Sequence, residues 1–106
     1  MKIVEVRSGR TNYVLTASRN RDGDLVVSGS DLSPWVKEMF STDEYEYFYV
    51  VKAPDVGRVC AALGATEDNL FDRMAALLAP HGTDASGQWK AWLTAQGIPF
   101  EFSVWR

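Results

Sequence analysis

Apolar and polar residues alternate along the first third of the chain, which is the pattern of strands with one buried face. The alternation predicts strands over residues 2–7, 12–18 and 25–29, separated by turns. The second turn contains Asp22-Gly23, a pair that suits a tight hairpin. We interpret Gly29, between two serines, as a turn glycine at the end of the third strand. Because sequential strands usually pair, the three segments are expected to form an antiparallel meander.

Residues 30–106 are predicted to contain both helices and strands. Residues 30–40 are predicted to form a short helix, because Ser33 can cap it and Pro34 fits its first turn. Residues 44–52 are rich in aromatic and β-branched side chains and are predicted to form a strand. The apolar spacing then becomes helical. It predicts helices over 53–64, 66–79 and 86–97, a loop over 81–86, and a last strand over 98–106, in which Pro99 marks an edge or a strand start.

The predicted order of elements is β-β-β-α-β-α-α-α-β. Strands that come first and helices that follow are typical of an α+β fold. We expect a mainly antiparallel sheet of about five strands with helices packed on one face. The chain of 106 residues is long enough for one domain with a core, so residues 1–106 are expected to form a single α+β domain.

Composition and charge limit the class of protein and its expected cellular location. The chain is 46% hydrophobic and 24% charged, as in ordinary globular proteins, and no apolar run approaches the ~20 residues of a membrane span. A single cysteine excludes an internal disulfide, and the first residues do not resemble a signal peptide, so we expect a cytoplasmic protein. The net charge of −3 is unevenly distributed, because residues 1–21 carry +4 and residues 22–46 carry −6.

Few residues carry catalytic or metal-binding chemistry. Cys60 falls on the apolar face of a predicted helix, where a cysteine is usually an inert hydrophobe. His81 is the only histidine and has no evident partner, so its role stays open, and a small enzyme that uses it with nearby carboxylates is a third hypothesis. No His or Cys spacing fits a metal site. We therefore expect no catalytic residues, no metal and no cofactor.

Nucleic-acid binding is disfavoured by the placement of the basic residues. Arg7 and Arg10 flank the first turn, whereas Arg19 and Arg21 flank the second. In a meander these turns lie at opposite ends of the sheet, so the four side chains would not form one basic patch. The acidic residues of 22–46 would also repel phosphate.

The stretch 41–52, STDEYEYFYVVK, is the most distinctive in the chain. Alternation places Glu44, Glu46, Phe48, Val50 and Lys52 on one face of the strand, and Tyr45, Tyr47, Tyr49 and Val51 on the other. We favour the arrangement in which Phe48 and Val50 pack under the helices and the tyrosines cover the open face of the sheet. If the tyrosines pack inward instead, the exposed surface reduces to the acids.

An exposed row of tyrosines flanked by acids is typical of a protein-binding surface, although tyrosines also cover ordinary exposed sheets. The expected contact residues are Asp43, Glu44, Tyr45, Glu46, Tyr47 and Tyr49. In size, charge layout and the stretch 29–51, GSDLSPWVKEMFSTDEYEYFYVV, the chain resembles small immunity proteins of bacterial toxin–immunity systems. The resemblance implies a non-enzymatic inhibitor that neutralises a cognate toxin, often a basic domain.

Besides the small enzyme that would use His81, two alternative functions remain from the sequence. The first is a structural domain that associates with itself as a homodimer, through the tyrosine face or through the terminal strand with Trp105. The second, which we favour less, is a nucleic-acid-binding module.

Overall fold

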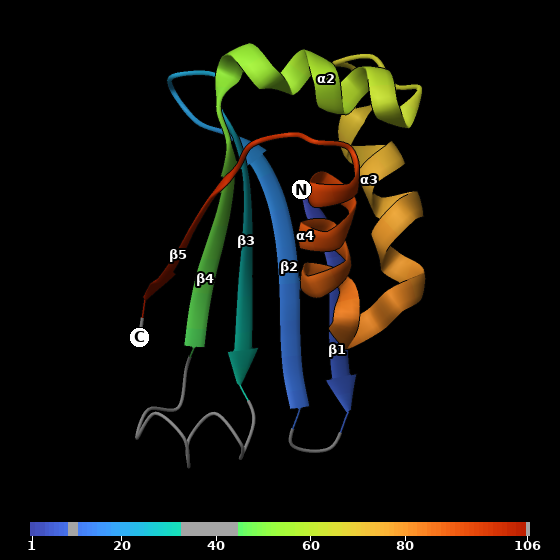
Figure 1. Ribbon diagram of the computed structural model, residues 1–106. Coiled ribbons are helices and arrows are strands. Elements are labelled where there is room, and N and C mark those ends of the chain that lie inside the picture. The colour runs from blue at the N-terminus through green and yellow to red at the C-terminus, as the bar shows by residue number, and fades with distance from the viewer. Residues whose placement is uncertain (9–10, 33–44, 106) are drawn as a thin grey trace.

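The computed structural model describes residues 1–8, 11–32 and 45–105 of the chain. Its strands form one antiparallel sheet in which neighbours in sequence are also neighbours in space (Figure 1). This arrangement confirms the predicted α+β class and the predicted meander, which β4 and β5 continue. The strands are β1 Lys2–Ser8, β2 Thr11–Arg19, β3 Leu25–Leu32, β4 Tyr45–Val51 and β5 Glu101–Trp105.

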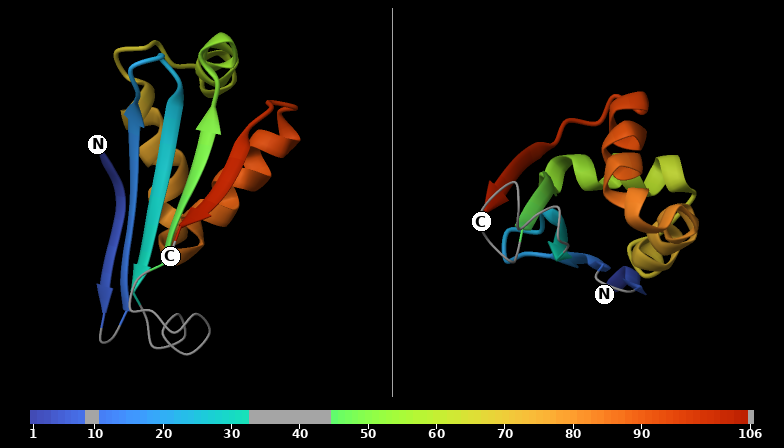
Figure 2. Two further views of the ribbon diagram at one scale, coloured as in Figure 1. Left: turned by 90° about the vertical axis from the view of Figure 1, so that its left-hand side faces the viewer. Right: turned by 90° about the horizontal axis from the view of Figure 1, so that it is seen from below.

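The helices pack on one face of this sheet. α3 and α4 run alongside β1 and β2, and α2 crosses one end of the strands (Figures 1 and 2). The predicted loop over 81–86 is largely 3-10 helix, and residues 30–32 of the predicted helix over 30–40 belong to β3. The rest of that helix lies outside the described residues. The helices are α2 Ala53–Leu63, α3 Leu70–Leu78, the 3-10 helix η1 Ala79–Asp84 and α4 Ala85–Ala95.

Each helix turns one apolar face toward the sheet. α2 has Pro54 in its first turn, and Gly64 caps its C-terminus with a φ of 65°, the left-handed conformation that favours glycine. Trp89 of α4 is fully buried, and Trp92 stacks on it with ring centroids 5.4 Å apart. The other buried helix residues are Val56, Val59, Cys60, Leu70, Met74, Leu78, Ala85 and Leu93.

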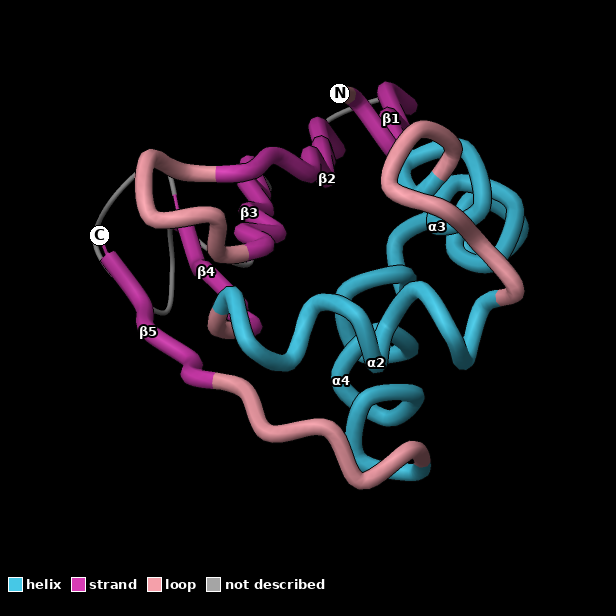
Figure 3. The backbone as a smooth tube through the Cα atoms, turned by 90° about the horizontal axis from the view of Figure 1, so that it is seen from above, coloured by secondary structure: helices cyan, strands magenta, loops and turns pink. Residues whose placement is uncertain are grey.

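The sheet curls around these helices, as seen down its strands in Figure 3. Its inner face supplies the other half of the core, and every second residue of the central strands is buried there. Together the sheet and helix residues form one cluster of buried side chains. The buried sheet residues are Ile3, Val4, Tyr13, Leu15, Ala17, Leu25, Val27, Tyr47, Tyr49 and Val51.

Gly29 lies in the middle of β3 and does not end the strand, which corrects its interpretation as a turn glycine. It pairs with Tyr47 of β4, and a Cβ atom at position 29 would collide with the Tyr47 ring. The ring therefore lies across the glycine of the neighbouring strand. A glycine inside a strand often marks such a close approach. This pair directs Tyr47 to the helix side of the sheet.

Asp24 joins the β2–β3 turn to the start of α2. Its carboxylate accepts hydrogen bonds from the Ala53 backbone N–H at 2.8 Å and from the Asn20 side chain at 3.2 Å. These two bonds, with the nearby Lys52 ammonium at 3.6 Å, hold the pKa of Asp24 below its ordinary value of 3.8. Asp24 is only 5% exposed, so this carboxylate of the acidic segment 22–46 stabilises the fold and is not part of the protein surface.

We predict that Gly29→Ala destabilises the protein by about 1–3 kcal/mol, because the added methyl group meets the Tyr47 ring. Gly57→Ala is the matched control, since its Cβ would meet nothing within 4 Å in α2, and it should be neutral or stabilising. Denaturant unfolding measures both. The cost of Gly29→Ala should also shrink in a Tyr47→Leu background, and equal costs in both backgrounds would contradict the steric explanation.

Asp24→Asn should lower the melting temperature at neutral pH, because it removes the charge that accepts the Ala53 and Asn20 hydrogen bonds. Folding lowers the pKa of Asp24 below its ordinary value of 3.8. The ionised carboxylate therefore contributes fully to the stability of the fold above pH 3.8, and this contribution is lost as the pH falls through the pKa of the folded state. The difference between wild type and variant should therefore narrow in acid. Calorimetry across this pH range measures it, with the exposed neighbour Asp22→Asn as control. A difference that is constant with pH contradicts the assignment.

Candidate functional site

The structure places only part of the predicted contact surface on the outside. Asp43 and Glu44 lie outside the described residues, as does the side chain of Tyr45, which begins β4. Glu46 is half-buried on the outer face of the sheet, the face away from the helices. Tyr47 and Tyr49 are each only 6% exposed, so neither presents a contact surface.

The favoured orientation of β4 is therefore wrong, and the tyrosines rather than Phe48 and Val50 pack under the helices. Gly29 makes room for the Tyr47 ring, and burial raises the pKa of the Tyr47 phenol. The Tyr49 ring lies edge-on to Tyr47 and contacts Phe102 with centroids 4.9 Å apart. The Tyr49 ring thus has an aromatic neighbour on each side, and these contacts offset the cost of burying the phenol groups in the core.

A third tyrosine connects this aromatic layer to the helices. The Tyr13 hydroxyl accepts a hydrogen bond of 3.0 Å from the backbone N–H of Ser86, in the first turn of α4. After burial, which raises the pKa of the Tyr47 phenol, hydrogen bonding with Ser86 lowers this pKa and hydrogen bonding with Tyr13 raises it. The polar ends of the rings are used in the fold, which explains how tyrosines can occupy a core position.

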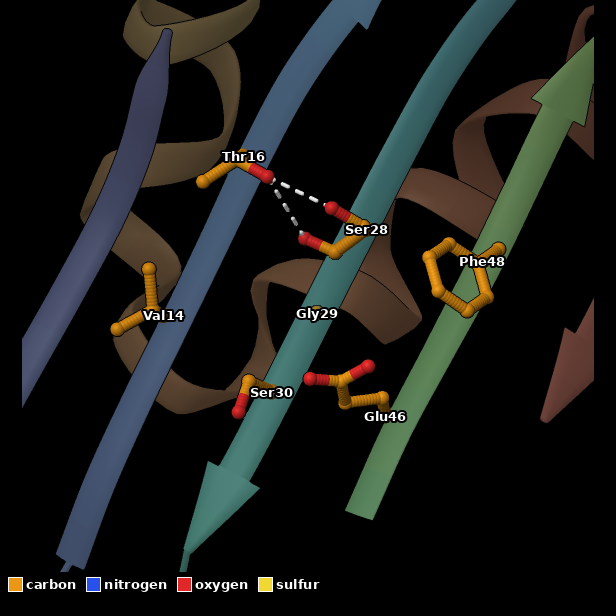
Figure 4. Close-up of a pocket in the computed structure, with 7 residues that line it drawn as sticks. All are labelled: Val14, Thr16, Ser28, Gly29, Ser30, Glu46 and Phe48. Carbon is orange, nitrogen blue, oxygen red and sulfur yellow. Dashed lines mark hydrogen bonds between the residues drawn. The ribbon is translucent and has the colours of Figure 1, made fainter. Parts of the chain in front are cut away.

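A hollow of about 110 Å³ opens on the outer face of the sheet, across β2, β3 and β4 (Figure 4). It exists because β3 carries two small side chains, Ser28 and Ser30, between longer ones on both neighbouring strands. The register aligns Thr16, Ser28 and Phe48 in one row across the sheet, and Val14, Ser30 and Glu46 in the next. These six residues and Gly29 line the hollow.

The chemistry of the hollow is mixed. The Thr16 and Ser28 hydroxyls lie 2.7 Å apart and form a hydrogen bond along one side. Figure 4 shows the Glu46 carboxylate reaching toward β3 and Ser30, with the Phe48 ring next to it along β4. The hollow thus combines one carboxylate, one aromatic ring and several hydroxyl groups. Its volume is well below the about 300–1,000 Å³ of small-molecule sites.

The hollow is absent from the sequence-based predictions for two reasons. The sequence predicts that Gly29 ends the third strand as a turn glycine, and that Phe48 packs in the core. The available signal was the length of the apolar alternation, because continuing the strand period from Val27 places both serines outside and Gly29 inside. A row of small residues between bulky ones then predicts a depression on the outer face.

The remaining candidates for chemistry lie apart from this hollow. Cys60 is buried in α2, and burial raises the pKa of its thiol. His81 is exposed in η1. Within residues 1–8, 11–32 and 45–105, no group of three or more His, Cys, Asp and Glu side chains is arranged to hold a metal ion. No helix in the same ranges is long and apolar enough to cross a membrane.

Comparison of the chain with protein-family models, with curated proteins and with solved structures found no match. The function of the protein is therefore inferred from the residues of this chain and their arrangement.

We predict that Cys60 reacts slowly with iodoacetamide at neutral pH. The thiolate is the reactive form, and burial both hides this thiol and raises its pKa. The reaction should be at least about tenfold slower than that of the same chain in denaturant. Mass spectrometry of timed samples measures both rates. A folded protein that is alkylated as fast as the unfolded chain would show that Cys60 is accessible and reactive.

Proposed function

We propose that the protein is a non-enzymatic protein-binding module whose contact surface is the outer face of the sheet around the hollow. One observation carries the proposal: the hollow combines a carboxylate and an aromatic ring on an open sheet face, and its size suits a single side chain. Binding energy in protein interfaces concentrates in a few such pockets, each filled by an anchor residue of the partner.

The anchor that this hollow fits best is an arginine or lysine side chain. A carboxylate such as Glu46 forms charge-assisted hydrogen bonds with either cation, and the face of Phe48 attracts the same charge. The hydroxyls of Ser28 and Thr16 supply further acceptors at the wall of the hollow. A basic partner surface therefore matches this site better than an acidic or a purely apolar one.

The most concrete form of this proposal is an immunity or antitoxin-like inhibitor that acts in the cytoplasm against a cognate bacterial toxin with a basic surface. The resemblance in size, charge layout and residues 29–51 supports it. Asp43, Glu44 and Tyr45 directly precede Glu46 in the chain, so they stay in the proposed contact surface. Phe48 takes the place of Tyr47 and Tyr49, which lie in the core. The acids would speed association with a basic partner.

The experiment uses the product of the gene next to that of this protein, expressed as a separate toxic domain. Wild-type protein should bind it and restore growth on co-expression. Glu46→Lys should slow association by about tenfold at low salt and flatten its salt dependence, because it reverses the charge at the hollow. Phe48→Ser should mainly speed dissociation, because it removes the apolar wall. Stopped-flow binding measures both rates.

Asp72→Lys is the matched control, since it makes the same charge change at an exposed position of α3, in the helix layer. It should leave both rates close to wild type. Circular dichroism and thermal unfolding establish that each variant is folded. A toxic domain that binds Glu46→Lys and Phe48→Ser as well as wild type overturns the proposed surface. A neighbouring product that is neither toxic nor bound removes the immunity form of the proposal.

A further inference from the structure

The two edge strands of the sheet differ in how they meet solvent. β1 carries exposed charged side chains, Lys2, Glu5 and Arg7, and its register with β2 shifts between Lys2 and Val4. Charges and irregular register are the usual means by which proteins prevent an edge strand from pairing with another chain. β5 instead presents Phe102 and Val104, which are 50% and 40% exposed.

The exposed residues of β5 continue the aromatic layer of the core. Phe102 pairs with Tyr49 and Val104 with Tyr47, so both lie on the helix side of the sheet. The Tyr49 ring contacts Phe102 at 4.9 Å and Phe100 at 5.9 Å between centroids. The helices stop short of β5, which stands at the open margin of the curled sheet (Figures 2 and 3). The apolar layer of the core thus continues to β5, where it is exposed at the edge of the sheet.

We propose that β5 pairs antiparallel with β5 of a second copy of this chain, about a two-fold axis at Ser103. Within the described residues, only β4 pairs with β5, so the other side of the strand offers backbone N–H and C=O groups. The pairing would join two sheets into one of twice the width. The proposal is separate from the toxin-binding function, because the hollow and the β5 edge are different surfaces.

The sequence of β5 is complementary to itself in this register. Pairing centred on Ser103 places Phe102 opposite Val104 of the second copy, twice, on the helix side of both sheets. Glu101 falls opposite Trp105 rather than opposite a second carboxylate. Centring the pair on Glu101 would bring two like charges together, which is unfavourable. The Lys52 ammonium, 3.7 Å from the Glu101 carboxylate, further reduces acidic repulsion at this edge.

The strand length limits the strength of the dimer. β5 runs only from Glu101 to Trp105, and Pro99 just before it has no N–H to donate. Such a short pairing, with two apolar side chains per copy, buries less than the about 1,200 Å² of a standard stable interface. The dimer is therefore reversible, and its population rises with protein concentration.

Sedimentation analysis across micromolar concentrations tests the proposal on the protein alone. Wild type should shift from monomer to dimer as its concentration rises. Val104→Lys, which places a charge on the exposed edge, should raise the dissociation constant by about tenfold or more. Ala76→Lys is the matched control, because it adds the same charge at an exposed position of α3, and it should dimerise as wild type does.

A disulfide trap tests the register. In a Cys60→Ala background, Ser103→Cys places two thiols across the two-fold axis, within the Cα separations that disulfides span. It should therefore cross-link readily under mild oxidation. Glu101→Cys is the register control: its thiol would face Trp105 of the second copy, far from its own equivalent, and should cross-link much more slowly.

Each result decides for or against the β5 dimer. A wild type that stays monomeric throughout overturns it and leaves the edge for a strand of a different protein. Dimerisation that Val104→Lys does not weaken places the interface elsewhere. Equal cross-linking at positions 101 and 103 overturns the two-fold register. Toxin binding is measured with a different partner and different variants, so either proposal can fail without the other.

Discussion

The steric fit of the Tyr47 ring over Gly29 determines which side of β4 faces the helices. Successive side chains of a strand point to opposite faces, so fixing one residue fixes all the others. With Tyr47 inside, Tyr49 and Val51 follow it into the core. Glu46 and Phe48 are then on the outer face, where they line the hollow. Both the core and the candidate site therefore depend on this one contact.

β3 serves both faces through its small residues. Gly29 on the inner face gives the tyrosine ring its space, and Ser28 and Ser30 on the outer face leave the depression between taller neighbours. A larger residue at any of these positions would remove either the core contact or the hollow. The strand thus links a requirement of the fold to the shape of the surface that we propose for binding.

The same alternation of inward and outward side chains extends across the sheet to β5. Because Tyr49 and Tyr47 point inward, their partners Phe102 and Val104 lie on the helix side as well. The helices do not reach that margin, and the apolar layer emerges at the edge. The outer face and the β5 edge are therefore distinct surfaces with distinct chemistry. One carries a carboxylate, a ring and hydroxyls, whereas the other carries apolar side chains and backbone hydrogen-bonding groups.

Periodicity in the sequence was sufficient to predict the fold class, the meander and the buried faces of the helices, because helix and strand spacings differ and each buries its apolar positions. It was insufficient where both faces of a strand carry aromatic residues. There the hydrophobic pattern of β4 allowed two orientations, and only contact with Gly29 of a neighbouring strand selected one. The tertiary structure also decided which acidic residues reach the surface, because the Asp24 carboxylate accepts a hydrogen bond from Ala53 at the start of α2. Local spacing determined the type and order of the elements, apart from the end of β3 and the 3-10 helix η1, whereas packing between strands decided which side chains are left for a partner.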